Sequence, residues 1–161
     1  MITNDSICMN NVLLASSQEV FETMIFMDLD QCFDEEQKIT DDTILSSITF
    51  KGDIDGCLTI CCNAECAKSI GINMLGMDPE EQISQEDTYD ALGEVANMVM
   101  GSIKTKIQDE VGNISVSIPM VVSGKDIVTN IGNTSQTKTT IKVTIDSVYF
   151  AEFCLVYRNN T

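Results

Sequence analysis

The stretch from residue 43 to residue 63, TILSSITFKGDIDGCLTICCN, constrains the fold of this chain more than any other. Two runs rich in β-branched residues flank a short segment that has a glycine at each end, Gly52 and Gly56. β-Branched side chains favour strands, and glycine reaches the backbone angles that tight turns require. The stretch therefore predicts a β-hairpin whose glycines supply the turn.

Helical patterns lie on both sides of this hairpin. Residues 7–27 place apolar and polar side chains with the period of one long amphipathic helix. Asn63 stands where a helix cap is expected, and the short helix after it should stop near Gly76. Ser84 opens the capping-box pattern SQED, which predicts a third, long helix that ends just before Gly112.

Strand-like stretches follow the long helix, and they are ISVSIP at 114–119, TTIKVTIDSV at 139–148 and YFAEFCLVY at 149–157. The turn-rich residues between the first two leave room for one short strand around Ile127 to Val128. The acidic segment 28–42 predicts a surface connection or a sheet edge. This order of elements predicts an α+β fold, with helices packed on a largely antiparallel sheet in a single domain over residues 1–161.

The charge of the chain argues against several classes of partner. Its 25 acidic and 9 basic side chains give a formal net charge of −16, which repels nucleic-acid phosphates and anionic lipid. No apolar run approaches the roughly 18 residues that span a bilayer, and the first residues do not resemble a secretory signal. We therefore expect no nucleic acid and no membrane as partners, and a cytoplasmic location.

Histidine is absent, which excludes Ser-His-Asp and Cys-His nucleophilic sites and His-containing zinc sites. The seven cysteines are an odd number in a chain without a signal, which argues against a disulfide framework. Cys57, Cys61, Cys62 and Cys66 form a sequence cluster without any C-x-x-C pair, so we interpret them mainly as buried thiols. No phosphate-binding glycine loop is present. We expect neither a metal nor a cofactor of the protein's own.

The long helix contains an unusual polar face in the stretch DALGEVANMVMG, residues 90–101. At about 100° per residue, a buried face should hold Leu92, Val95, Ala96, Val99 and Ile103. The opposite, exposed face should hold Asp90, Glu94, Asn97 and Gly101, with Gly93 at its border. An exposed helical glycine costs about 1 kcal/mol relative to alanine, and asparagine is a poor helix former. These residues therefore suggest a docking face for a macromolecule, although a merely solvated face remains an alternative.

The spacing Asp90-x3-Glu94-x2-Asn97, followed after 21 residues by Pro119, resembles the signature of the CheC/CheX/FliY chemotaxis phosphatases. The likeness is greatest to CheX, because the first helix offers Ala15, Glu19 and Glu22 where a second copy of the motif would need Asp or Ser, Glu and Asn. The resemblance implies a homodimer with an intermolecular sheet, formed by a strand from the Ile127 or the Ile141 region.

The resemblance also implies a function. The chain would be a hydrolase that removes phosphate from the aspartyl phosphate of a CheY-like response regulator, which itself supplies Mg²⁺. Asn97 would position the attacking water, and Glu94 would dock on the regulator's active-site lysine. Asp90, Gly93 and Gly101 would be further docking residues.

Two alternatives stay open at the level of sequence. One is a non-catalytic adaptor that binds a phosphorylated regulator or a receptor-modifying enzyme. The other is a domain that binds a metal or a small molecule through its cysteines.

Overall fold

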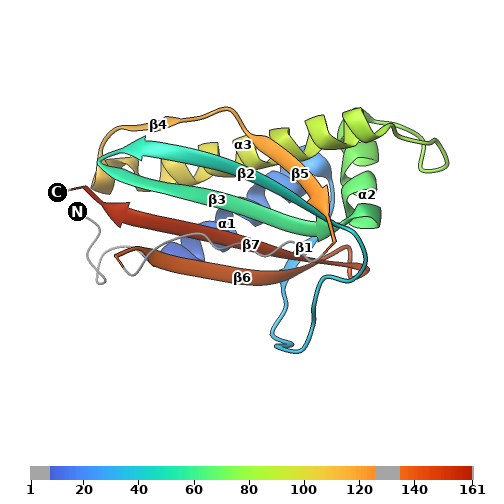
Figure 1. Cartoon of the computed structure of the whole chain (residues 1–161), viewed down its shortest axis with the longest axis horizontal. Coiled ribbons are helices and arrows are strands. Elements are labelled where there is room, and N and C mark those ends of the chain that lie inside the picture. The colour runs from blue at the N-terminus through green and yellow to red at the C-terminus, as the bar shows by residue number, and fades with distance from the viewer. Residues whose placement is uncertain (1–7, 126–134, 161) are drawn as a thin grey trace.

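The computed structural model of the chain describes residues 8–125 and 135–160. Within these ranges three α-helices and one π-helical turn pack against a seven-stranded sheet (Figure 1). The helical segments are α1 (Met9–Val20), η1 (Phe21–Ile25), α2 (Ala64–Leu75) and α3 (Gln85–Val111). The strands are β1 (Leu29–Gln31), β2 (Thr43–Gly52), β3 (Ile54–Asn63), β4 (Ile114–Val116), β5 (Met120–Gly124), β6 (Thr137–Ile145) and β7 (Tyr149–Asn159).

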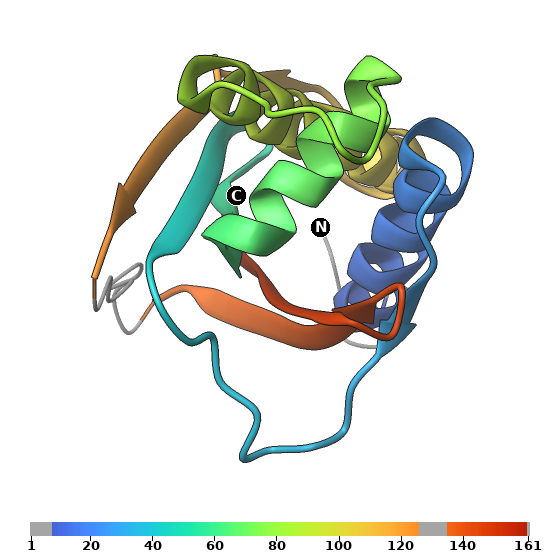
Figure 2. The ribbon, with the colours of Figure 1, turned by 90° about the vertical axis from the view of Figure 1, so that its right-hand side faces the viewer.

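Every strand pairing in the described residues is antiparallel, which confirms the predicted α+β fold. The strand order is β1-β6-β7-β3-β2-β4, and β5 also pairs with β2. The sheet curves around the helices, which lie on one of its faces (Figure 2). Alternate side chains from the strands point into the core between the two layers. The largest fully buried ones from the strands are Ile48, Phe50, Ile54, Leu58, Ile60 and Phe153.

The predicted hairpin is formed by β2 and β3, but its turn is tighter than the sequence suggested. The strands stay paired as far as Phe50 opposite Gly56, and only Asp53 separates them after Gly52, whose φ is +152°. Gly56 therefore lies inside β3 and not in the turn. A Cβ at Gly56 would lie 2.1 Å from the Val156 carbonyl oxygen and 2.4 Å from Phe50 Cζ, so glycine is required there by packing.

The predicted ends of the second and third helices are confirmed. The Asn63 carboxamide oxygen accepts a hydrogen bond from the Cys66 N–H at 2.9 Å, and the Ser84 hydroxyl accepts one from the Asp87 N–H at 3.0 Å. Such side chains satisfy amides that the first helical turn leaves unpaired. Gly76 ends α2 in the left-handed conformation, with φ +63°.

The first helix differs from its prediction as a single element over 7–27. It is α-helical to Val20, continues as a π-helical turn and ends at Phe26, which adopts a left-handed backbone with φ 61°. The turn keeps both Phe21 and Ile25 fully buried, and the Phe21 ring lies 5.9 Å from that of Phe153. The wider turn thus allows the end of the helix to stay packed on the sheet.

The acidic segment 28–42 contributes the edge strand β1 and then a surface loop, in line with its prediction. Lys142 on β6 holds this loop, because its ammonium group donates to the carbonyl oxygens of Glu35 and Gln37 at 3.0 and 3.3 Å. The short strand expected around Ile127 to Val128 lies outside the described residues. Strand β5 was not expected, since its few apolar residues follow a proline.

Candidate functional site

The helical register of α3 divides its side chains as the periodicity predicts. The five residues expected in the core are all fully buried, and they are Leu92, Val95, Ala96, Val99 and Ile103. Asp90, Glu94, Asn97 and Gly101 are all exposed on the other side of the helix. A core role for Glu94 and Asn97 is therefore excluded.

Gly93 does not belong to this exposed face, although the helical register placed it at the border, and its role as a docking residue stays a prediction. It is buried, because the edge of the sheet crosses the helix at this point. A Cβ at Gly93 would lie 3.5 Å from Pro119 Cγ and 3.7 Å from Val121 Cγ2, both ordinary van der Waals distances. A Cβ at Gly101, in contrast, would meet nothing within 4 Å. Of the two glycines, only Gly101 leaves open space beside Asn97.

Polar contacts fix the first half of α3 on the sheet. The buried Ser46 hydroxyl on β2 donates to the Leu92 carbonyl oxygen at 2.9 Å. One turn earlier, the Tyr89 hydroxyl donates to Ser123 on β5 and accepts from the Gln85 carboxamide. Because these bonds restrain rotation of the helix, the direction of its outer face is set by the fold.

The side chains of Asp90, Glu94 and Asn97 form no hydrogen bond or ion pair with any residue in the described ranges. Glu86 and Asp87 in the first turn of α3 are exposed as well, so the amino-terminal half of the helix presents an acidic surface. Asn97 adds a neutral carboxamide whose oxygen and nitrogen are both available. Such a group can accept from and donate to one water molecule.

Two pockets of the described residues lie away from this face. A pocket of about 360 Å³ lies near the start of α3, where Asp42, Lys68 and Tyr89 are among its lining residues. A second pocket lies beside the end of β7, and neither pocket is lined by Glu94 or Asn97. Small ligands are bound in concave sites that bury most of their surface. An exposed helix face suits a partner that brings its own cleft.

On the corresponding face of α1 and η1, one carboxylate is paired within the chain. Ala15, Glu19 and Glu22 are all exposed, as the motif comparison expects. However, the Glu19 carboxylate accepts from the Lys106 ammonium group at 2.5 Å and from the Ser102 hydroxyl at 3.3 Å. The hydrogen bond and charge of Lys106 lower the pKa of Glu19, so this carboxylate is committed to α3.

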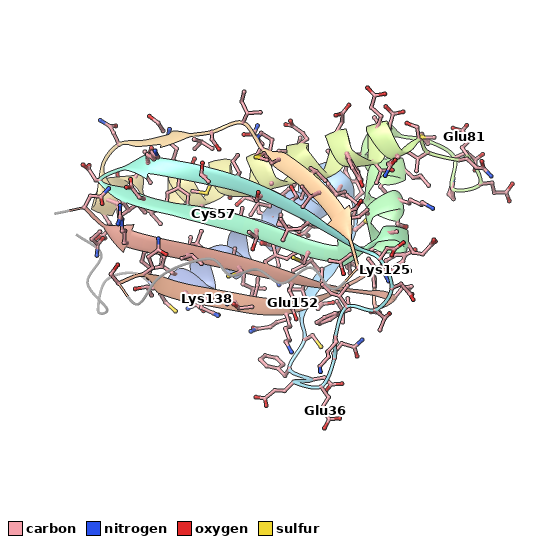
Figure 3. All side chains as sticks on the ribbon, viewed as in Figure 1. Glu36, Cys57, Glu81, Lys125, Lys138 and Glu152 are labelled. Atoms are coloured by element: carbon pink, nitrogen blue, oxygen red, sulfur yellow. The ribbon has the colours of Figure 1, made fainter. Side chains whose placement is uncertain are left out.

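The cysteines of β3 lie on both faces of the sheet. Cys57, labelled in Figure 3, and Cys61 lie on the face away from the helices, whereas Cys62 points into the core towards Cys66 in α2. Burial raises the pKa of the Cys61 thiol to about 11, so this thiol stays protonated at neutral pH. The described residues contain no group of three potential ligands that could hold a metal ion.

A protein-family model described as "Chemotaxis phosphatase CheX" matches residues 44–144. The matched region includes α3 and every position from Asp90 to Pro119. The chain belongs to the CheX family. A search of curated proteins found no match to the chain. None of the helices in the described ranges is long and apolar enough to cross a membrane.

Solved structures of CheX and CheC-like proteins share the fold of this CheX family member. The chemotaxis protein CheX from Vibrio vulnificus is 24% identical with a TM-score of 0.76, over 97% of this chain and 100% of that one. A CheC-like superfamily protein from Shewanella sp. PV-4 is 26% identical with a TM-score of 0.68, over 95% and 100%. A CheX from Borrelia burgdorferi, solved as a CheX-CheY-BeF3-Mg complex, is 14% identical with a TM-score of 0.67, over 92% and 97%.

Proposed function

We propose that this chain hydrolyses the aspartyl phosphate of a CheY-like response regulator. Asn97 positions the attacking water, and Glu94 pairs with the lysine of the regulator's active site. The observation that supports this most strongly is the outward carboxamide of Asn97, one turn from Glu94 on a helix fixed to the sheet, in a member of a phosphatase family.

The reaction needs orientation more than a strong base. The water oxygen bonds to phosphorus in line with the aspartyl oxygen, whose bond to phosphorus breaks, and the products are inorganic phosphate and a free aspartate. Phosphoryl transfer of this kind has a loose transition state with charge spread over the phosphoryl oxygens. The oxygen of a neutral carboxamide can accept a hydrogen bond from the water and so hold it in place. It adds no negative charge near the phosphoryl group.

Glu94 suits a different task in the same contact. Its carboxylate is exposed and unpaired among the described residues, so it is available for a cationic side chain of the partner. A charge-assisted hydrogen bond to a lysine would fix the register of α3 in the regulator's cleft. The Mg²⁺ that neutralises the phosphoryl oxygens would be held by the regulator. A 100-fold acceleration requires about 2.7 kcal/mol, which orientation alone can supply.

Two findings on relatives support this assignment. The matching family model describes a chemotaxis phosphatase, and the Borrelia burgdorferi CheX with this fold was solved in a complex with CheY, BeF3 and Mg. Beryllium fluoride takes the place of a phosphoryl group, so that complex presents the kind of partner proposed for this chain.

The test is the rate at which a phosphorylated CheY-like regulator from the same cell loses phosphate. The wild-type chain is expected to accelerate the loss. Asn97→Ala should return the rate to that of the regulator alone, while circular dichroism and Tm remain those of the wild type. An unchanged rate in that variant overturns the mechanism. Tight binding of the phosphorylated regulator without any acceleration by the wild type would instead identify a non-catalytic adaptor.

The expected homodimer stays a prediction. Ile141 lies within β6, with β7 on one side, and β1 pairs only with residues 143–145 of that strand on the other. Ile127 lies outside the described residues. Light scattering of the purified chain would give the assembly directly.

A further inference from the structure

A β-bulge separates β4 from β5 at the edge of the sheet. The Ser117 N–H donates to the Thr49 carbonyl oxygen at 2.9 Å, and Met120 pairs with Ser47. Two residues, Ile118 and Pro119, therefore stand opposite the single residue Ile48 of β2. Strands β4 and β5 are thus one edge strand with one extra residue inserted. Proline suits this position because it has no N–H to leave unpaired.

The bulge changes which side chains face the core. Ile114 and Val116 before it pack against the core, and Val121 after it does the same. Val116 and Val121 are five positions apart, whereas a regular strand places on one face only residues that are an even number of positions apart. Ile118 would continue the inward series of β4 in a regular strand. It is instead 87% exposed, while Pro119 packs over Gly93 of α3. Bulges redirect side chains in this way, often beside functional sites.

Ile118 is exposed but firmly placed. The Ser117 hydroxyl accepts from the Thr49 N–H at 3.0 Å on one side of the bulge, and β5 is hydrogen-bonded to β2 on the other. The ring of Pro119 rests on the helix between them. Because these contacts hold the backbone on both sides of Ile118, a partner that covers its side chain does not also have to order a loop.

The bulge adjoins the proposed catalytic face. Pro119 packs on Gly93, and these two residues are the immediate chain neighbours of Ile118 and Glu94. Met120, directly after Pro119, is 66% exposed. The path of this edge along α3 can be followed in Figure 1. Ile118 and Met120 therefore form an exposed apolar strip beside the acidic face of α3. Docking surfaces commonly combine apolar anchors, which the partner buries, with charged contacts around them.

We propose that Ile118 is a docking residue that the phosphorylated response regulator covers when it engages the Glu94 and Asn97 face. This inference rests on the proposed function, because continuity with the Glu94 and Asn97 face selects the partner. Ile118 contributes binding energy that is the same before and during phosphate transfer. Such uniform binding changes KM and leaves kcat unaltered.

The test is the dissociation constant for a CheY-like regulator activated with beryllium fluoride and Mg²⁺. Ile118→Ser should weaken binding about tenfold, because an isoleucine side chain that becomes buried contributes on this scale. KM for phosphorylated regulator should rise by a similar factor, with kcat within about twofold. The matched control is Val148→Ser, since Val148 is a β-branched residue that is 75% exposed in the β6–β7 turn. The control should bind like the wild type.

Three results would overturn the inference. One is wild-type affinity in Ile118→Ser, and another is a lower kcat with an unchanged KM. The third is a change in oligomeric state with unchanged affinity, which would assign Ile118 to self-association. If the wild type binds the activated regulator but does not hydrolyse phosphate, the proposed function fails while the affinities still decide the role of Ile118.

Discussion

Helices α1 and α3 present related polar faces, but they differ in whether the glutamate of the motif is already paired within the chain. On α3, Glu94 and Asn97 are exposed and unpaired among the described residues. On α1, the glutamate at the matching place is Glu19, and it is bound to Lys106 of α3. The residue three positions later is Glu22, a carboxylate, where α3 has a carboxamide. The same spacing thus accompanies an uncommitted face on α3, which we propose as the docking face, and an internal brace on α1.

Under the proposed mechanism, a functional face needs more than the right residue types at the right spacing. The side chains have to remain uncommitted within their own chain, and the group nearest to the phosphate has to be neutral. A carboxylate at that place would repel the phosphoryl oxygens. Glu22, at the position that matches Asn97, carries a negative charge. Glu19, at the position that matches Glu94, is already bound to Lys106.

The largest effect in this comparison is expected from reversing one charge on each face. Glu94→Lys should weaken binding of the activated regulator at least tenfold, since it removes the partner of a lysine and places a like charge beside it. Glu22→Lys changes the net charge equally on the α1 face and should alter affinity less than about twofold. Isothermal titration calorimetry at one fixed salt concentration gives the dissociation constants of both variants for the activated regulator. Equal losses would mean that only the overall charge matters.

A smaller effect is expected from the two glycines of α3. Gly101→Ala and Gly93→Ala should each raise the free energy of unfolding by about 0.5–1 kcal/mol, because neither new Cβ meets a clash and helical glycine is costly. Only Gly101→Ala should weaken regulator binding, by a few-fold, if the open space at Gly101 admits the partner's backbone. Denaturant unfolding and the same binding measurement test both. Wild-type affinity in Gly101→Ala would remove that docking role.

The smallest effect concerns the α1 brace. Lys106→Met should lower the free energy of unfolding by less than about 1 kcal/mol at pH 7, as is usual for exposed ion pairs. The pKa of Glu19 is lowered from 4.5 in the folded chain, so the unfolded chain takes up the proton first as the pH falls. The stabilisation is therefore complete above pH 4.5 and declines as the pH falls from 4.5 through the lowered pKa of folded Glu19. A gap between variant and wild type that does not shrink as the pH is lowered below 4.5 would contradict this assignment.

The exposed face of α3 could be predicted because helix geometry is local. A period of 3.6 residues and the cap at Ser84 determine which side chains point outward once a core covers the other side. The hairpin of β2 and β3 and the fold class follow from similarly local patterns. The burial of Leu92 and the exposure of Asn97 needed no knowledge of which strand lies beneath.

The misplaced features all depend on contacts between distant segments. Gly93 is buried because Pro119, far along the chain, packs on it. The direction of Ile118 depends on one extra residue in a strand pairing that the pattern ISVSIP does not reveal. Pro119 was the available signal, since a proline at a sheet edge often accompanies a bulge or a strand end. Likewise, glycine is required at position 56 because the Val156 backbone of the neighbouring strand lies so close, and not because position 56 is in a turn.

The central claim is that a neutral carboxamide at position 97 steers water onto the regulator's phosphate. Its most direct test is the single-turnover rate of phosphate loss from a phosphorylated regulator at saturating Asn97→Asp, a variant of nearly the same shape with an added negative charge. We expect the rate to fall to that of the regulator alone, with the fold retained. A rate equal to that of the wild type at neutral pH would contradict it.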